Sequence, residues 1–169
     1  MRLLPYEDFY INSPLTPAEI QIKLEQELLS PQPSLQPFGN WNGNNNGTAF
    51  FKGYAFNGIF EIERCIAYRN SFLPKIKGET YPNLQGSRVH IQMKLMSVIL
   101  IFMCIWMSGT VIAFISMLIS ELNDSNLNVD ILVPFGMFIF GYSLTTLSFK
   151  WESKLSKNKL LDLFEGQIE

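Results

Sequence analysis

Two long runs without a charged residue dominate this chain of 169 residues. Residues 95–120 hold 26 uncharged, mostly apolar positions, and residues 131–149 hold 19 more. A helix needs about 20 such residues to cross the hydrocarbon core of a bilayer. A chain this small cannot bury two helices that are apolar nearly all round. The two runs therefore predict a pair of membrane-spanning helices, joined by a short loop over residues 121–130.

The positive charges predict the orientation of this helical hairpin. All thirteen Lys and Arg lie outside it, nine in residues 1–94 and four in residues 150–169. The charged residues of the loop are all acidic: Glu121, Asp124 and Asp130. Basic flanks stay in the cytoplasm, so we expect both termini there and the loop on the outer side. Glu7 and Asp8 come before any apolar stretch can form, so we do not expect the start of the chain to act as a signal peptide.

The composition and the positions of the cysteines argue against nucleic acid as a partner and against a disulfide framework. Charged residues make up 17% of the chain, below the roughly 25% of soluble domains. The net charge of −2 leaves no basic stripe for nucleic acid. Cys65 lies in a strand-like run and Cys104 in an apolar run, so we expect no disulfide between them.

The segment before the apolar runs, residues 1–94, predicts a helix and a sheet. Thr16, Pro17 and Glu19 form a capping-box helix start. After it, apolar residues recur on one helix face, namely Ile20, Leu24 and Leu28. We expect this helix to pack on a sheet. The alternative is a helix lying on the membrane surface, but its polar face mixes acids with one lysine, which suits anionic lipid poorly.

Residues 31–48, rich in Pro, Gly, Asn and Gln, predict a mobile linker. Residues 49–94 then predict an antiparallel meander of four strands, and residues 8–11 could add another. Asn57-Gly58 is a hairpin signal between the first two strands. The last strand alternates cleanly. We expect its apolar positions to be buried, namely Val89, Ile91, Met93 and Leu95. We expect its polar positions to face solvent, namely Arg88, His90, Gln92 and Lys94.

Residues 150–169 predict a helix that continues to about Glu165. Its apolar positions are Trp151, Leu155, Leu161 and Phe164. Aromatic side chains there need a partner surface. The sheet is the nearest one, because an antiparallel hairpin returns the chain to its side, and the bilayer surface is the alternative. The predicted fold class is thus an α+β membrane protein, a cytosolic antiparallel meander covered by N- and C-terminal helices, with a two-helix transmembrane hairpin.

Sites for chemistry are sparse in this sequence. It contains no GxxxxGKS/T, GxGxxG, HExxH or CxxC motif. His90 is a single histidine without an informative partner, so we interpret it as a surface side chain. Glu61 and Glu63 share one strand face, which is more typical of a solvated face than of acid–base chemistry. We therefore predict no catalytic residues, no metal site and no cofactor.

One polar group, Arg64 with Arg69, Asn70 and Ser71, is a candidate contact for an anion or a partner. Arg64 interrupts an apolar strand face, and a buried guanidinium needs a carboxylate or a ligand. The alternative, which we favour, is an internal ion pair of Arg64 with Glu79 or Glu61.

Three short stretches carry a resemblance to a known group of proteins. They are YRNSFLPKIKG at residues 68–78, GSR at residues 86–88 and FKWE at residues 149–152. With them the chain resembles small uncharacterised bacterial proteins that have a cytosolic strand-rich part followed by two membrane helices. The resemblance implies a bacterial inner membrane and nothing catalytic. The order of elements is also similar to START-like ligand-binding folds, from which the short meander and the intervening hairpin depart.

Two classes of function follow from these features. The first is a membrane-anchored, non-enzymatic module that presents its cytosolic sheet to a partner protein. The second is binding of a lipid or small apolar ligand between sheet and helix, which the aromatic strand residues permit. A sheet filled by its own side chains favours the first class, and an open apolar pocket of a few hundred Å³ favours the second.

Overall fold

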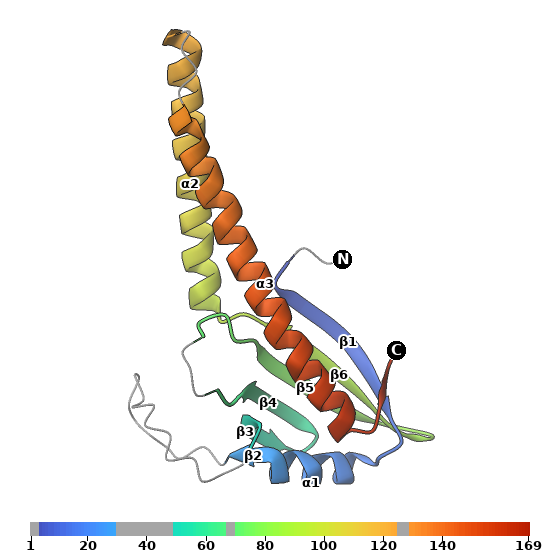
Figure 1. The fold of residues 1–169 in the computed structure, drawn as a ribbon. Helices are drawn as coiled ribbons and strands as arrows, with labels where there is room; N and C mark the ends of the chain where they lie inside the picture. Colours follow the sequence, from blue (N-terminus) through green and yellow to red (C-terminus); the bar gives the residue numbers. More distant parts are fainter. Residues whose placement is uncertain (1–3, 30–48, 67–69, 125–128) are drawn as a thin grey trace.

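The computed structural model of the protein describes residues 4–29, 49–66, 70–124 and 129–169. These residues form a seven-stranded sheet with one short helix, and two long helices rise from it side by side (Figure 1). The predictions of an α+β fold, of a meander and of two helices apolar enough to cross a membrane are confirmed. The predicted linker over residues 31–48 lies outside the described ranges.

The sheet has the order β2-β3-β4-β5-β6-β1-β7. All neighbours are antiparallel except β2 and β3, which are parallel. The first strand thus lies beside β6, the last strand of the meander, and the C-terminal strand closes that edge. The bounds are β1 Tyr6–Ser13, β2 Leu28–Leu29, β3 Phe51–Phe56, β4 Ile59–Arg64, β5 Lys75–Asn83, β6 Gly86–Lys94 and β7 Gln167–Ile168.

Turn chemistry sets the register of the meander. Asn57 and Gly58 connect β3 to β4 with φ of +51° and +77°, the pattern of the two-residue turn that suits twisted hairpins.

In β5, Gly78 leaves space for the ring of Phe60 on β4, since a Cβ built there would lie 2.0 Å from the ring. The ring can therefore lie across the neighbouring strand and stay in the core.

The short helix α1, Pro17–Glu27, begins at the predicted capping box. The backbone N–H of Thr16 donates to the Glu19 carboxylate at 2.8 Å, and the Glu19 N–H donates to the Thr16 hydroxyl at 3.4 Å. The hydrogen bonds from Thr16 lower the pKa of Glu19. Ile20 and Leu24 are buried against the sheet.

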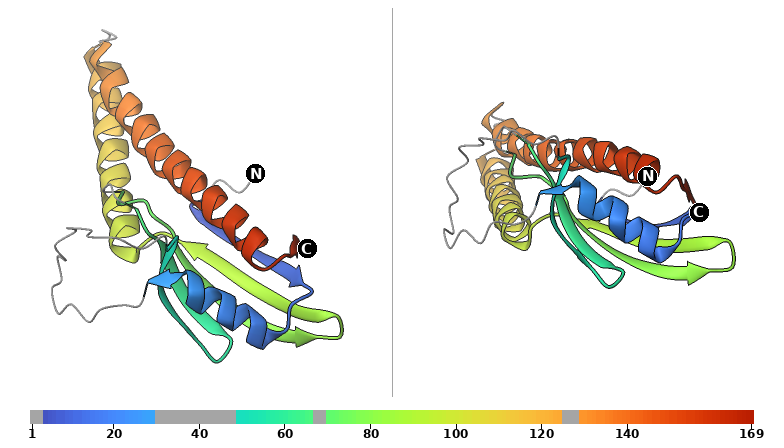
Figure 2. Two further views of the ribbon diagram at one scale, coloured as in Figure 1. Left: turned by 60° about the horizontal axis from the view of Figure 1, so that its bottom comes forward. Right: turned by 90° about the horizontal axis from the view of Figure 1, so that it is seen from below.

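The two long helices are α2, Ser97–Asp124, and α3, Leu132–Leu163, which is preceded by a 3-10 turn over Val129–Ile131. α3 is continuous. Its first half runs beside α2, and its second half crosses the sheet (Figures 1 and 2). Near and beyond the end of the apolar run, Phe149, Leu160 and Phe164 are fully buried. The ring of Phe164 meets that of Phe60 edge to face, with centroids 6.1 Å apart.

The hydrophobic core lies between one face of the sheet and the helices α1 and α3. Figure 2 shows both helices on the same side of the strands. The strands contribute alternate residues, as a half-buried sheet should. The predicted burial of Val89, Ile91, Met93 and Leu95 is confirmed. The other strand residues of the core are Phe9, Ile11, Phe51, Phe60, Ile62 and Ile76.

Three details of the predicted packing are wrong. Leu28 does not continue the α1 face, because its backbone is extended and pairs with Phe51 in the short parallel ladder of β2 and β3. Trp151 and Leu155 point away from the sheet and are 73% and 39% exposed. A different side of α3 packs on the sheet. Besides apolar residues, that side contains three buried polar residues, namely Glu152, Ser153 and Ser156.

Candidate functional site

The predicted polar group centres on a residue that the sequence pattern did not single out. Arg64, the last residue of β4, forms an ion pair through Nη1 with Glu152 of α3, whose side chain is 2% exposed. Asn70 donates from Nδ2 to the other oxygen of Glu152 at 3.1 Å, while its own Oδ1 accepts the N–H of Phe72 at 3.0 Å. Arg64, Asn70 and Glu152 therefore form a partly buried polar cluster that joins the sheet to α3.

This cluster corrects the ion pair expected for Arg64. Glu61 instead binds Lys77 at 3.0 Å, and Glu79 accepts a hydrogen bond from the Tyr81 hydroxyl. Both glutamates lie on the opposite face of the sheet, because they alternate with the buried residues of their strands. The Arg64 guanidinium is thus held by the buried carboxylate of Glu152.

Of the other two members of the predicted group, the structure describes one. Ser71 is exposed in the turn after Asn70. Arg69 lies outside the described residues. Among the three predicted residues that the structure describes, it therefore brings Arg64 and Asn70 together around a carboxylate from a distant helix.

The face of the sheet turned away from the helices carries a second polar network, centred on Asp8. His90 Nε2 lies 2.7 Å from Asp8 Oδ1, and the Tyr6 hydroxyl donates to Asp8 Oδ2 at 2.6 Å. The hydrogen bond from Tyr6 is the main cause of an Asp8 pKa below its ordinary value, and His90 lowers that pKa further. Gln92 adds a donor to the same carboxylate at 3.3 Å.

The residues predicted to face solvent on β6 are more enclosed than expected. His90 stacks on Tyr10 with ring centroids 4.5 Å apart, and the Arg88 guanidinium lies 4.2 Å above the same ring. Arg88, His90 and Gln92 are consequently half-buried, while Lys94 is exposed. No local pattern signals this arrangement, because the carboxylate that pairs with His90 lies 82 positions away. A histidine–carboxylate pair can move protons, and His90 contacts the Asp8 carboxylate and the stacked Tyr10 ring.

We call this side of the sheet the outer face. It is defined by the following residues: Tyr6, Asp8, Tyr10, Lys52, Tyr54, Glu61, Glu63, Lys77, Tyr81, Arg88, His90 and Gln92. Its charges form pairs across the strands, Lys52 with Glu63 at 2.8 Å and Lys77 with Glu61 at 3.0 Å. Two tyrosines stand out from it, and they are 53% and 47% exposed: Tyr54 and Tyr81. No described helix or strand covers this face.

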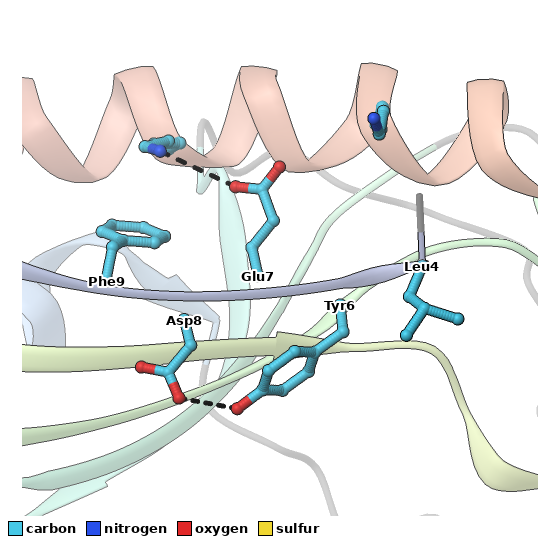
Figure 3. A pocket seen from close by; sticks show the side chains of 7 residues that line it. Leu4, Tyr6, Glu7, Asp8 and Phe9 are labelled. Carbon is cyan, nitrogen blue, oxygen red and sulfur yellow. Dashed lines mark hydrogen bonds and ion pairs between the residues drawn. The ribbon is translucent and has the colours of Figure 1, made fainter. Parts of the chain in front are cut away.

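A cleft of about 260 Å³ lies between β1 and α3. Figure 3 shows Glu7 and Phe9 on the side of β1 that faces the helix, with Tyr6 and Asp8 turned to the other side. The helix contributes two lysines, and an exposed leucine lies at one end; these residues are Lys150, Lys157 and Leu4. The Lys157 ammonium lies 3.7 Å from Glu7 and 4.1 Å from the centroid of the Phe9 ring. We refer to this site as the β1–α3 cleft.

The space under α1 is by contrast almost filled. The cavity there, lined by Ile20, Leu24, Phe60 and their neighbours, measures about 10 Å³. A single buried water needs roughly 10–15 Å³, so the cavity has no room for an organic ligand. Among the described residues, no group of three His, Cys, Asp or Glu side chains could hold a metal ion. Burial raises the pKa of the Cys65 thiol, which disfavours the reactive thiolate.

No protein-family model, no curated protein and no solved structure matches this chain.

Proposed function

We propose that this protein is a membrane-anchored, non-enzymatic module that holds a small cytosolic sheet domain at the bilayer and presents its outer face to a partner protein. The observation that carries the proposal is the continuity of α3. One unbroken helix contains an apolar run long enough to span a bilayer and also completes the core of the sheet domain. The outer face is on the side of the sheet that this helix leaves open.

The exposure of the long helices supports insertion into a bilayer. Only 6% of the apolar window of α2 and 17% of that of α3 are buried within the chain. The core helix of a soluble protein would be mostly buried, and apolar surface on this scale needs another cover. The distribution of Lys and Arg supports termini in the cytoplasm. The resemblance to small bacterial two-helix membrane proteins supports the inner membrane of a bacterium.

Insertion and orientation can be tested together with reporters fused after Glu169. A fluorescent reporter that matures in the cytoplasm should be active there, and an alkaline phosphatase, which needs the periplasm, should not. The protein should also stay in the membrane pellet after carbonate extraction. A periplasmic C-terminus, or release by carbonate, would overturn this part of the proposal.

The composition of the outer face supports a protein partner. It exposes tyrosines and carries an arginine stacked on Tyr10, and Tyr and Arg are enriched at the centres of protein interfaces. Its charges are largely paired within the face, and Arg88 binds Glu169 of the C-terminal segment. A face without a dominant sign of charge suits a protein better than nucleic acid, which requires a basic surface.

Photo-crosslinking in membranes tests the partner. A crosslinking amino acid replaces Tyr54 or Tyr81, and Ile22 is the control, since it is 54% exposed but lies on α1 at the other side of the domain. We expect one discrete adduct from the outer face, lost in an Arg88→Glu background, and none from Ile22. Equal adducts from both sides, or an adduct with a second copy of this chain, would contradict a dedicated partner.

The alternative of an apolar ligand between sheet and helices has less support. The cavity under α1 is about 10 Å³, far below the several hundred Å³ of ligand pockets. The larger β1–α3 cleft has charged walls and lies at the edge of the core.

A further inference from the structure

We propose that the β1–α3 cleft binds the phosphate of an anionic phospholipid headgroup, with Lys150 as its main cation. The proposal rests on the membrane insertion argued above but does not depend on the partner protein. Lys150 directly follows the apolar run that ends at Phe149. In an inserted protein this position is at the boundary between hydrocarbon and headgroups, where lysine side chains meet lipid phosphates.

The ammonium group of Lys150 is available to a phosphate. Within the described parts of the chain, no carboxylate lies within the 4 Å of an ion pair with Lys150. Lys157 forms an ion pair with Glu7 at 3.7 Å, so a phosphate shares this second lysine with that carboxylate. The two lysines are seven positions apart, which is about two helical turns, so they lie on the same side of α3.

The acids lining the cleft do not cancel this charge. Asp8 is turned away from the helix (Figure 3) and already accepts hydrogen bonds from Tyr6 and Gln92 besides its contact with His90. Among the lining residues that the structure describes, Glu7 is thus the one carboxylate that faces the helix, against two lysines. An anionic ligand is therefore favoured over a cation at this position.

The size and walls of the cleft fit a headgroup and not a complete lipid. Its volume of about 260 Å³ is below the roughly 300–1,000 Å³ of sites that enclose drug-sized ligands. Leu4 lies at one end of the cleft and is 71% exposed, so it can contact the glycerol or the first acyl carbons. The chains of the lipid would then remain in the bilayer.

Lipid retention by the full-length protein tests this site. The protein is placed in nanodiscs of phosphatidylcholine with a minor fraction of phosphatidylglycerol, and retained lipid is measured by native mass spectrometry after release. We expect retention of phosphatidylglycerol over phosphatidylcholine. Lys150→Gln should reduce that retention about fivefold, the effect of one lysine near a membrane surface. Glu7→Gln should increase it, because Lys157 is then freed.

Lys154→Gln is the matched control. Lys154 is on the same helix, one turn further, and exposed, but it does not line the cleft. Equal losses in Lys150→Gln and Lys154→Gln would show general surface attraction and overturn the site. Displacement of the lipid by millimolar inorganic phosphate would instead show a site for free anions and would also overturn it. Protein that fails to enter the discs refutes membrane insertion itself, whereas inserted protein without a Lys150 effect refutes the site alone.

Discussion

At the scale of single residues, Glu152 is buried where the apolar run of α3 ends, and its carboxylate is shared by Arg64 and Asn70. A buried ion pair contributes little over a well-packed apolar pair, but removing one partner leaves a charge without compensation. The cluster thus makes the contact between α3 and β4 specific. A helix rotated or shifted along the sheet would leave both charges in an apolar environment.

The variant Glu152→Ala should therefore lower the free energy of unfolding by about 3–5 kcal/mol. The double variant Arg64→Met with Glu152→Met should recover most of that loss, because no lone charge remains. Hydrogen exchange of the β5 and β6 amides in detergent measures the stability of the single and of the double variant. A double variant as unstable as the single one would mean that the ion pair itself, and not the avoidance of a lone charge, supports the contact.

Val89 tests the assignment of the two sheet faces. It is fully buried between Ile11 and Thr80 of the neighbouring strands. Val89→Asp should destabilise the sheet domain by several kcal/mol, since a lone charge is costly to bury. Asn12→Asp, at an exposed position opposite Arg88, introduces the same charge and should have little effect in limited proteolysis. Similar protease sensitivity of the two variants would argue against a half-buried strand.

Asp8 makes the stability of the sheet domain depend on pH. Its pKa is lowered in the folded protein, chiefly by the Tyr6 hydroxyl. A lowered pKa contributes stability above the unfolded value of about 3.9, and this stability is lost as pH falls through the lower folded pKa. Tyr6→Phe should move the Asp8 pKa upward, as followed by NMR of the carboxyl carbon. An unchanged pKa would assign the shift to His90 and Gln92.

At the scale of elements, the second half of α3 is needed to cover the sheet. Truncation after Lys150 removes Leu160 and Phe164 from the core. We expect such a protein to remain in the membrane while its strands become sensitive to protease. Removal of residues 167–169 alone, which deletes β7 at the sheet edge, should leave the strands protected. Full protection after the longer truncation would show that the sheet does not require α3.

Local patterns predict most of the elements. The capping box of α1, the Asn57-Gly58 turn and the alternation of β6 each depend on neighbouring residues, and all three are present as expected. The rotation of α3 is not predictable from such patterns. Its apolar pattern points Trp151 toward the sheet, whereas Ser153 and Ser156 are buried there, because small side chains allow close approach. Glu152 lies 88 positions from Arg64, and His90 lies 82 positions from Asp8, so no local spacing reveals either contact.

At the scale of the molecule, the sheet domain is assembled from two segments separated by the helical hairpin. Ser13 donates to the carbonyl of Phe164 at 2.5 Å, and Lys23 binds Glu165 at 2.6 Å. A second ion pair, 3.2 Å long, joins Lys159 to Glu27, so α1 and the end of α3 are connected at two points. The N-terminal elements therefore cannot complete their packing until residues 150–169 have been made and the hairpin has returned the chain.

In the membrane-anchored arrangement proposed above, the unbroken α3 couples the tilt of its apolar run to the position of the sheet domain. A helix adapts to a thicker or thinner membrane by changing its tilt. The part of α3 from Lys150 to Leu163 extends about 21 Å beyond the boundary, so a tilt change of about 10° would swing its end by roughly 4 Å. Distances between spin labels at Leu122 and Tyr81, measured in bilayers of short and long acyl chains, should stay constant, while the depth of Tyr81 above the lipid changes. Membrane thickness would then set how far the outer face reaches into the cytoplasm.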